Sequence, residues 1–82
     1  MSASGESKSE SAPVVLIEII VNGELKQVPA GLNIPRLLDQ LGIRADRVAI
    51  ERNLNILSKD RWQETIVVSG DSFEIVHFVG GG

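Results

Sequence analysis

The dipeptide Asn22-Gly23 stands between two runs of strand-forming residues, and it constrains the fold more than any other feature of the chain. Asn and Gly accept the positive φ values of a type I′ turn, which joins antiparallel strands directly. Glu18 requires the solvent face of residues 16–21 and therefore fixes the register of that strand. We predict a hairpin that pairs residues 16–21 with residues 24–28. The side chains that then face the core are those of Ile17, Ile19 and Val21.

A short helix is predicted after the hairpin. Asn33 can cap it, Pro35 is tolerated in its first turn, and Gly42 supplies its end. The spacing i, i+3, i+4 and i+7 gives one apolar stripe, formed by Ile34, Leu37, Leu38 and Leu41. A helix of about two turns is unstable alone in water, so its stripe must pack across the sheet.

The rest of the chain predicts further strands and turns. The predicted elements are a strand at 48–52, a turn at 53–55, a short segment at 56–57, a helical turn capped by Ser58 that ends at Trp62, a turn at 69–71 and a final strand at 72–78. A hairpin, one crossing helix and further strands are typical of an α+β domain of the β-grasp type, with a mixed sheet under a single layer of helix.

The length of 82 residues fits one small domain with little interior for a catalytic cleft, which favours a binding or carrier role over an enzyme. Residues 1–13 form a polar, Ser-rich segment that we expect to be disordered, because it has too few apolar groups to offset the entropy of ordering. That segment lacks the features of a targeting signal, so a cytoplasmic protein is expected. The domain is predicted at 14–78, and a flexible glycine tail at 79–82.

Composition excludes several classes of function. The chain has no Cys, so sulfur cannot be carried on a thiol side chain, and its one histidine, His77, leaves too few ligands for a metal site. The net charge of -3 and the scattered basic residues argue against nucleic-acid binding. No apolar run approaches the roughly 20 residues that span a bilayer.

The chain ends in Gly80-Gly81-Gly82, and the α-carboxylate of Gly82 is the predicted reactive group. Glycine lacks a Cβ, so a narrow channel of another protein can close around this tail. Four extended residues reach about 13 Å beyond the sheet. The carboxylate is ionised at neutral pH and is a poor acyl donor, so a partner enzyme must activate it with ATP. The alternative is a flexible terminus without a function.

The segments at 48–53, 59–62, 70–71 and 73–82 resemble the ThiS family, the sulfur carriers of thiamine biosynthesis, and the resemblance covers residues 16–82. It implies a ubiquitin-like β-grasp fold, adenylation of Gly82 by an ATP-dependent, ThiF-like activating enzyme, and conversion to a thiocarboxylate. It further implies a sulfur donor such as a cysteine desulfurase, delivery to a ThiG-like thiazole synthase, and no cofactor bound by the carrier itself. Leu54 departs from the family pattern, because similar sequences often have glycine there.

Parity along the last strand separates core from surface. Phe73 and Ile75 are predicted to face inward, with His77 half-buried on the same side, and Trp62 is interpreted as a core residue. The opposite parity faces solvent beside the tail, where aromatic anchors commonly form docking surfaces. The residues predicted to bind partners are Glu74, Val76, Phe78 and Val79.

Two other interpretations remain open from the sequence. One is a carrier of the molybdopterin synthase small-subunit type, although that family typically approaches its glycines through proline, and Val79 follows Phe78 here. The other is a ubiquitin-like modifier joined to protein amines through Gly82, or an interaction module with an idle tail.

Overall fold

The computed structural model describes residues 13–78, so the predicted disordered segment and the glycine tail lie outside the described residues, apart from Pro13. The elements are β1 (Leu16–Val21), β2 (Glu24–Pro29), α1 (Ile34–Leu41), β3 (Val48–Arg52), β4 (Asn55–Ile56) and β5 (Ser72–His77). Their order confirms the predicted hairpin, helix and later strands, and β4 adds a short fifth strand.

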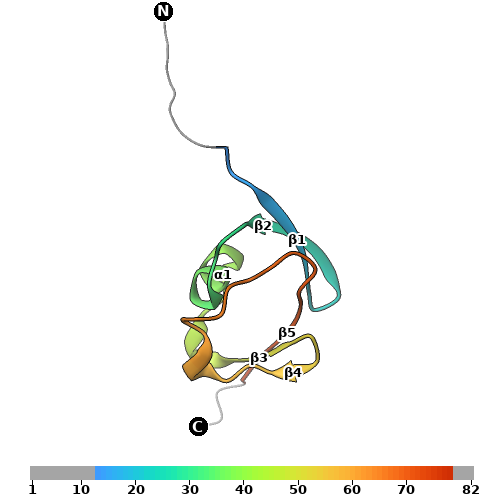
Figure 1. Cartoon of the computed structure of the whole chain (residues 1–82). Coiled ribbons are helices and arrows are strands. Elements are labelled where there is room, and N and C mark those ends of the chain that lie inside the picture. Colours follow the sequence, from blue (N-terminus) through green and yellow to red (C-terminus); the bar gives the residue numbers. More distant parts are fainter. Residues whose placement is uncertain (1–12, 79–82) are drawn as a thin grey trace, which may run out of the picture.

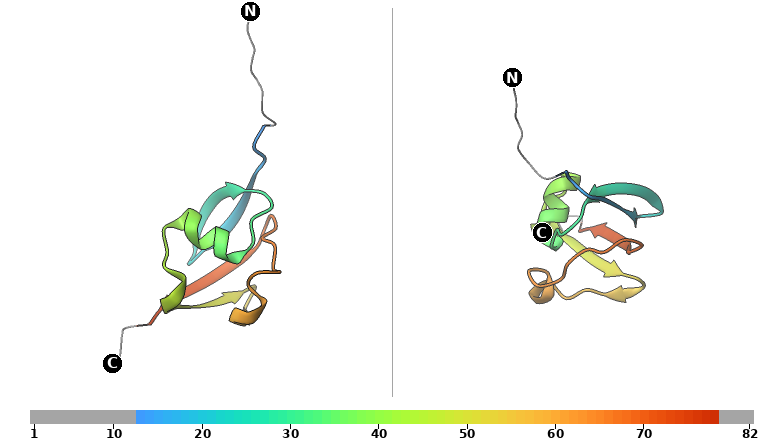
Figure 2. Two further views of the ribbon diagram at one scale, coloured as in Figure 1. Left: turned by 90° about the vertical axis from the view of Figure 1, so that its left-hand side faces the viewer. Right: turned by 45° about the horizontal axis from the view of Figure 1, so that its top comes forward.

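The five strands form one mixed sheet in the order β2-β1-β5-β3-β4. β1 and β5 run parallel, whereas the other neighbouring pairs are antiparallel. α1 lies across one face of this sheet (Figures 1 and 2). The predicted α+β architecture, with one helix on a mixed sheet, is therefore confirmed, and β5 occupies the centre of the sheet.

The hairpin of β1 and β2 follows the predicted register, with Val21 opposite Glu24 across a two-residue turn. Asn22 and Gly23 have φ values of 50° and 82°, as a type I′ turn requires. Glu18 is exposed and Ile19 is buried, which confirms that the charged residue sets the face of this strand.

Both predicted ends of α1 are present. The Asn33 side chain accepts a hydrogen bond from the Arg36 N–H at 3.0 Å, and Gly42 ends the helix in the left-handed region at φ 72°. The apolar stripe packs on the sheet, although Leu41 at its end is only partly buried. The buried core consists of Ile19, Val21, Val28, Ile34, Leu37, Leu38, Val48, Ile50, Trp62, Val67, Phe73 and Ile75.

The turn before Trp62 differs in detail from the prediction. A 3₁₀ helix, Lys59–Arg61, follows Ser58, but the Ser58 hydroxyl hydrogen-bonds to the Asp60 carboxylate and makes no capping bond to the backbone. Trp62 is buried, as predicted, and its indole N–H donates to the Leu57 carbonyl oxygen at 3.1 Å. That bond satisfies the polar edge of the ring inside the core.

The turn between β3 and β4 places a leucine where glycine is favoured. Arg52 pairs with Asn55, so the turn has two residues, and Asn53 and Leu54 have φ values of 51° and 72°. Leu54 is 89% exposed, so packing of its side chain contributes little free energy to offset the cost of this backbone conformation. A left-handed conformation costs a residue with a Cβ about 1–2 kcal/mol.

Replacing this leucine is therefore expected to stabilise the protein. Leu54→Gly should raise the free energy of unfolding by about 0.5–1 kcal/mol, because relief of the strain exceeds the entropy that glycine loses on folding. Urea denaturation measures the change. Leu25→Gly is the matched control, since Leu25 is an exposed leucine in β2, and there glycine should destabilise the strand. A destabilised Leu54→Gly protein would show that the turn is not strained.

Candidate functional site

The candidate site begins where β5 ends, at the root of the glycine tail. The Phe78 N–H donates to the Arg47 carbonyl oxygen at 2.8 Å, which fixes the last described residue to the segment before β3. The predicted tail residues, Val79, Gly80, Gly81 and Gly82, lie outside the described residues. Their point of departure is thus a hydrogen-bonded backbone at the end of the central strand.

Asn22 holds β5 from its other side. Beyond the paired residues of β1, the Asn22 N–H donates to the Phe73 carbonyl oxygen at 2.8 Å. The Asn22 side chain then accepts from the Ile75 N–H at 2.7 Å and donates to the Ile75 carbonyl oxygen at 3.2 Å. The Asn22 side-chain amide therefore takes the place of a backbone peptide group and extends the hydrogen bonding along β5, the strand that precedes the tail.

The outward-facing side of β5 carries an apolar surface beside the tail root. Val76 and Phe78 are 57% and 58% exposed, which confirms their predicted outward orientation. Ile56 of β4, which is 84% exposed, and Val76 line a shallow hollow of about 170 Å³ with Ala49. We call Ile56, Val76 and Phe78 the outer patch. Ile56 and Val76 expose apolar surface around one hollow, and Phe78 adds an exposed aromatic side chain two residues after Val76. Grouped exposed apolar side chains make this side of the sheet a candidate docking site.

Two carboxylates border the outer patch. Glu74, the remaining predicted partner-binding residue among those described, is exposed, and it stands directly opposite Glu51 on β3. Like charges at directly opposed positions of neighbouring strands destabilise a sheet. Neither carboxylate takes part in an ion pair found among residues 13–78, which is consistent with a surface adapted to a partner.

His77 corrects the parity prediction. It shares the side of Phe73 and Ile75, yet it is exposed rather than half-buried, because β5 runs past the edge of the core at this point. His77 instead lines an open hollow at the tail root together with Gly42, Arg44, Arg47 and Phe78. Sequence reasoning missed the two arginines, although the pairing of 48–52 with 72–78 would have placed both beside the tail.

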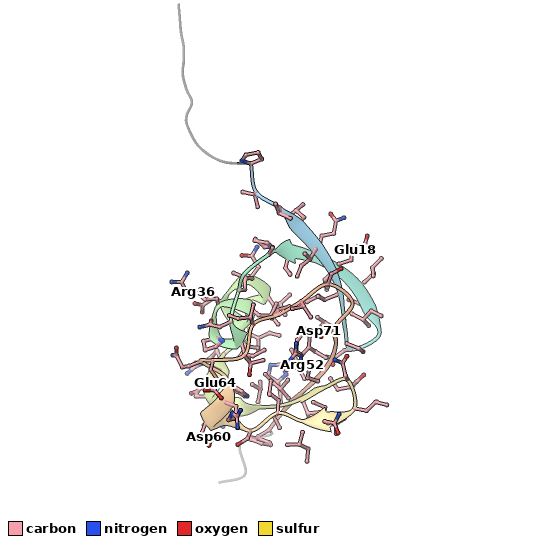
Figure 3. All side chains as sticks on the ribbon, in the orientation of Figure 1. Glu18, Arg36, Arg52, Asp60, Glu64 and Asp71 are labelled. Carbon is pink, nitrogen blue, oxygen red and sulfur yellow. The ribbon has the colours of Figure 1, made fainter. Side chains whose placement is uncertain are left out.

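A polar network holds the loops that precede β4 and β5, and sequence reasoning missed it too. Asp71 is only 3% exposed, and one of its carboxylate oxygens accepts from the Arg52 guanidinium at 2.9 and 3.1 Å. The same oxygen accepts from the Val68 N–H at 2.9 Å, and the other accepts from the Asn53 amide at 3.2 Å. Figure 3 shows Arg52 and Asp71 side by side.

These contacts shift the titration of Asp71. Burial disfavours its charged form, but the hydrogen bonds outweigh burial, so the pKa of Asp71 lies below its usual value. Asp71 is nearly inaccessible to solvent, and both of its carboxylate oxygens accept hydrogen bonds from the protein itself. We therefore assign Asp71 to the fold and not to the functional site.

The described residues offer no cluster of three or more His, Cys, Asp or Glu side chains that could hold a metal ion. Among the helices of this part of the chain, none is long and apolar enough to cross a membrane.

Comparison with known proteins identifies the family. The family model of the ThiS family matches residues 19–82. The sulfur carrier protein ThiS of Escherichia coli (strain K12) is 30% identical over 66 residues, which are 80% of this chain and 100% of that protein. A crystal structure of the thiamine biosynthesis protein ThiS from Geobacter metallireducens aligns with a TM-score of 0.71 at 33% identity, covering 80% of this chain and 100% of that one.

Longer proteins contain a segment similar to this chain. The thiazole synthase of Paramagnetospirillum magneticum (strain ATCC 700264 / AMB-1) is 39% identical over 66 residues, which are 80% of this chain but only 20% of that protein. This chain thus spans about a fifth of the length of the thiazole synthases that it matches.

The strand order, the single crossing helix and the match to the Geobacter structure confirm the predicted ubiquitin-like β-grasp fold. The family match runs from β1 to Gly82 and includes the outer patch and the glycine segment. A curated sulfur carrier is matched over its whole length. The chain therefore belongs to the ThiS family, whose members include sulfur carrier proteins.

Proposed function

We propose that this protein is a sulfur carrier of thiamine biosynthesis and that the α-carboxylate of Gly82 is its working group. The observation that carries the proposal is the family match, which extends through Gly82 and so includes the Gly80-Gly81-Gly82 segment. The fold supports it, because the central strand β5 ends at His77, and Phe78, the last described residue before this segment, belongs to the exposed outer patch.

The chemistry proceeds on a partner enzyme of the ThiF-like type. A carboxylate oxygen of Gly82 attacks the α-phosphorus of ATP, which forms an acyl-adenylate and releases pyrophosphate. The outer sulfur of a persulfide, carried by a donor such as a cysteine desulfurase, then attacks the carbonyl carbon and displaces AMP, which leaves an acyl disulfide. A thiol from outside the chain attacks the donor's sulfur in that disulfide, so a new disulfide forms and the thiocarboxylate is released. The carrier itself binds no cofactor in this scheme, because ATP is held by the activating enzyme. We propose the cytoplasm as the compartment of this cycle.

Thiazole synthase is the proposed acceptor of the sulfur. The support is the similarity of this chain to a segment of two curated thiazole synthases. A carrier-like segment within the same polypeptide as a synthase keeps donor and acceptor at high effective concentration. A carrier that is not joined to the synthase reaches the same site by docking, for which the outer patch is available.

Intact-mass spectrometry of the protein isolated from its native cell tests the proposal. We expect a fraction of the molecules to have one oxygen replaced by sulfur at the C-terminus, and fragmentation should place that change at Gly82. An isopeptide-linked target at Gly82 would instead support a ubiquitin-like modifier. Unmodified protein, before and after incubation with activating enzyme, ATP and a sulfur source, would contradict the carrier function.

Docking of the activating enzyme through the outer patch yields a separate prediction. Phe78→Ala should weaken binding by more than about 1 kcal/mol, because exposed aromatic side chains at the centre of a docking surface commonly contribute this much. Its thermal stability should barely change, since the ring is 58% exposed. Isothermal titration calorimetry and a thermal melt measure the two effects.

Leu25→Ala is the matched control for this experiment. Leu25 is 64% exposed but lies in β2, at the opposite edge of the sheet from β4. It should leave binding unchanged. If Phe78→Ala lowered stability and left affinity intact, Phe78 would serve packing and not recognition.

A further inference from the structure

The hollow at the tail root concentrates positive charge in an acidic protein. Its volume is about 420 Å³, and it is lined by Gly42, Arg44, Arg47, His77 and Phe78. Two of these five residues are arginines and none is acidic, whereas the whole chain has a net charge of -3. Positive charge is thus placed locally where the tail departs.

The backbone holds these side chains at fixed positions. Val48 pairs with His77, and the hydrogen bond from Phe78 to the Arg47 carbonyl oxygen continues that ladder by one step. Gly42, in the left-handed region at φ 72°, turns the chain at the end of α1 and leads it toward Arg44. The two arginines therefore emerge from a segment anchored at both ends.

The guanidinium groups are available to an external anion. The Arg44 side chain is 82% exposed and pairs with Asp46 at 3.2 Å, an interaction that lowers the pKa of Asp46. Surface pairs of this kind are worth little, so Arg44 can exchange Asp46 for another carboxylate at small cost. For Arg47, also exposed, no ion pair is found with any residue that the structure describes.

The geometry points to this hollow as a subsite for carboxylate side chains on the surface of the enzyme that activates the tail. The inference rests on the proposed function and adds the chemistry that the partner must present. Carboxylates of a protein fit better than the phosphates of ATP. In the proposed function ATP meets the far end of the tail, and four residues can span about 13 Å when they are extended, which is far enough to separate ATP from the hollow.

The hollow and the outer patch form one continuous footprint, because Phe78 belongs to both. On one side of Phe78 lie apolar groups bordered by Glu51 and Glu74, and on the other side lie the two arginines. A partner that matches both sides has only one orientation in which the tail points into its active site. The two arginines therefore speed the encounter with the partner enzyme and orient the complex. Electrostatic complementarity affects association rate and orientation more than it affects final affinity.

The test measures ATP–pyrophosphate exchange by the activating enzyme of the same organism as a function of carrier concentration. Salt is set at about 0.01 M and about 0.15 M, where the Debye length is about 30 Å and about 8 Å. For Arg44→Gln/Arg47→Gln we expect KM for the carrier to rise about fivefold or more at the lower salt, with kcat unchanged and a smaller rise at the higher salt. Arg44→Glu/Arg47→Glu should raise KM further, whereas Asp46→Asn should lower it.

Arg36→Gln is the matched control, because Arg36 is an exposed arginine at the other end of α1 from Gly42, and Figure 3 shows it projecting away from the tail end of the domain. Its KM should stay at the wild-type value. Equal KM values for wild type and the double Gln variant would overturn the inference, as would a fall in kcat alone, which would indicate contact with ATP. Absence of exchange with the wild-type protein would instead overturn the proposed function. A thermal melt confirms that each variant is folded.

Discussion

Removal of Gly82 is expected to abolish adenylation and thiocarboxylate formation while leaving the fold intact. The shortened carboxylate falls about 3.5 Å short of the position that the partner's site is built to receive. Misplacement of a reacting group by about 1 Å can already cost about a hundredfold in rate. One residue added after Gly82 should be equally inactive, because it moves the carboxylate past the same position. Pyrophosphate release and intact mass after incubation with activating enzyme, ATP and a sulfur source measure the effect.

The matched control for the tail is truncation at the other end of the chain. Deletion of residues 1–12 should leave turnover unchanged and stability within about 0.5 kcal/mol, as expected for a polar segment outside the domain. A thermal melt of each variant should give similar midpoints. Normal turnover by the protein that lacks Gly82 would show that another group is reactive, and the carrier function would be wrong.

Loss of the Asp71 carboxylate is expected to be the most damaging single change to the fold among the polar residues described. Asp71→Ala should lower the free energy of unfolding by about 3 kcal/mol, because removal of one partner leaves a largely buried charge uncompensated. Arg52, whose side chain is 28% exposed, would lose its carboxylate, and the Val68 N–H would lose its acceptor. Urea denaturation measures the loss. Asp60→Asn is the control, because Asp60 is exposed, and the free energy of unfolding of this variant should stay within about 0.5 kcal/mol of the wild-type value.

The pH dependence of Asp71→Asn provides an independent check. The folded pKa of Asp71 is depressed, so its contribution is fully present above the unfolded pKa of about 3.9 and is lost as pH falls through the folded value. Wild type should therefore exceed the Asn variant in stability at neutral pH, and the two curves should converge in acid. Parallel curves down to the lowest pH measured would show that the carboxylate carries no such linkage.

Local rules made much of the fold predictable from the sequence. Glu18 and the Asn22-Gly23 turn determine the first hairpin through interactions a few residues apart, and Asn33 and Gly42 mark the ends of α1 in the same way. The outward orientation of Val76 and Phe78 followed from the period of the strand.

Features that depend on distant pairing could not be predicted in this way. The local sequence predicts only that Asp71 lies in a turn. Its hydrogen bond with Arg52, 19 residues earlier, forms only when the sheet is folded. Asn22 is likewise predicted as a turn residue, although its side chain also accepts a hydrogen bond from the N–H of Ile75, 53 residues later. The prediction that His77 is half-buried was wrong, because the alternation of side chains along a strand shows which side a residue faces but not where the core ends.

The central position of β5 has a mechanical consequence for the proposed carrier function. β5 is held by β3 along one side and by β1 and Asn22 along the other, with the ladder bonds perpendicular or inclined to the strand. A pull on the tail acts along the strand axis, so it loads these bonds together in shear and does not peel them off one at a time. If the proposed function is right, an activating enzyme can therefore pull on the tail while the domain remains folded, because the sheet bears the load.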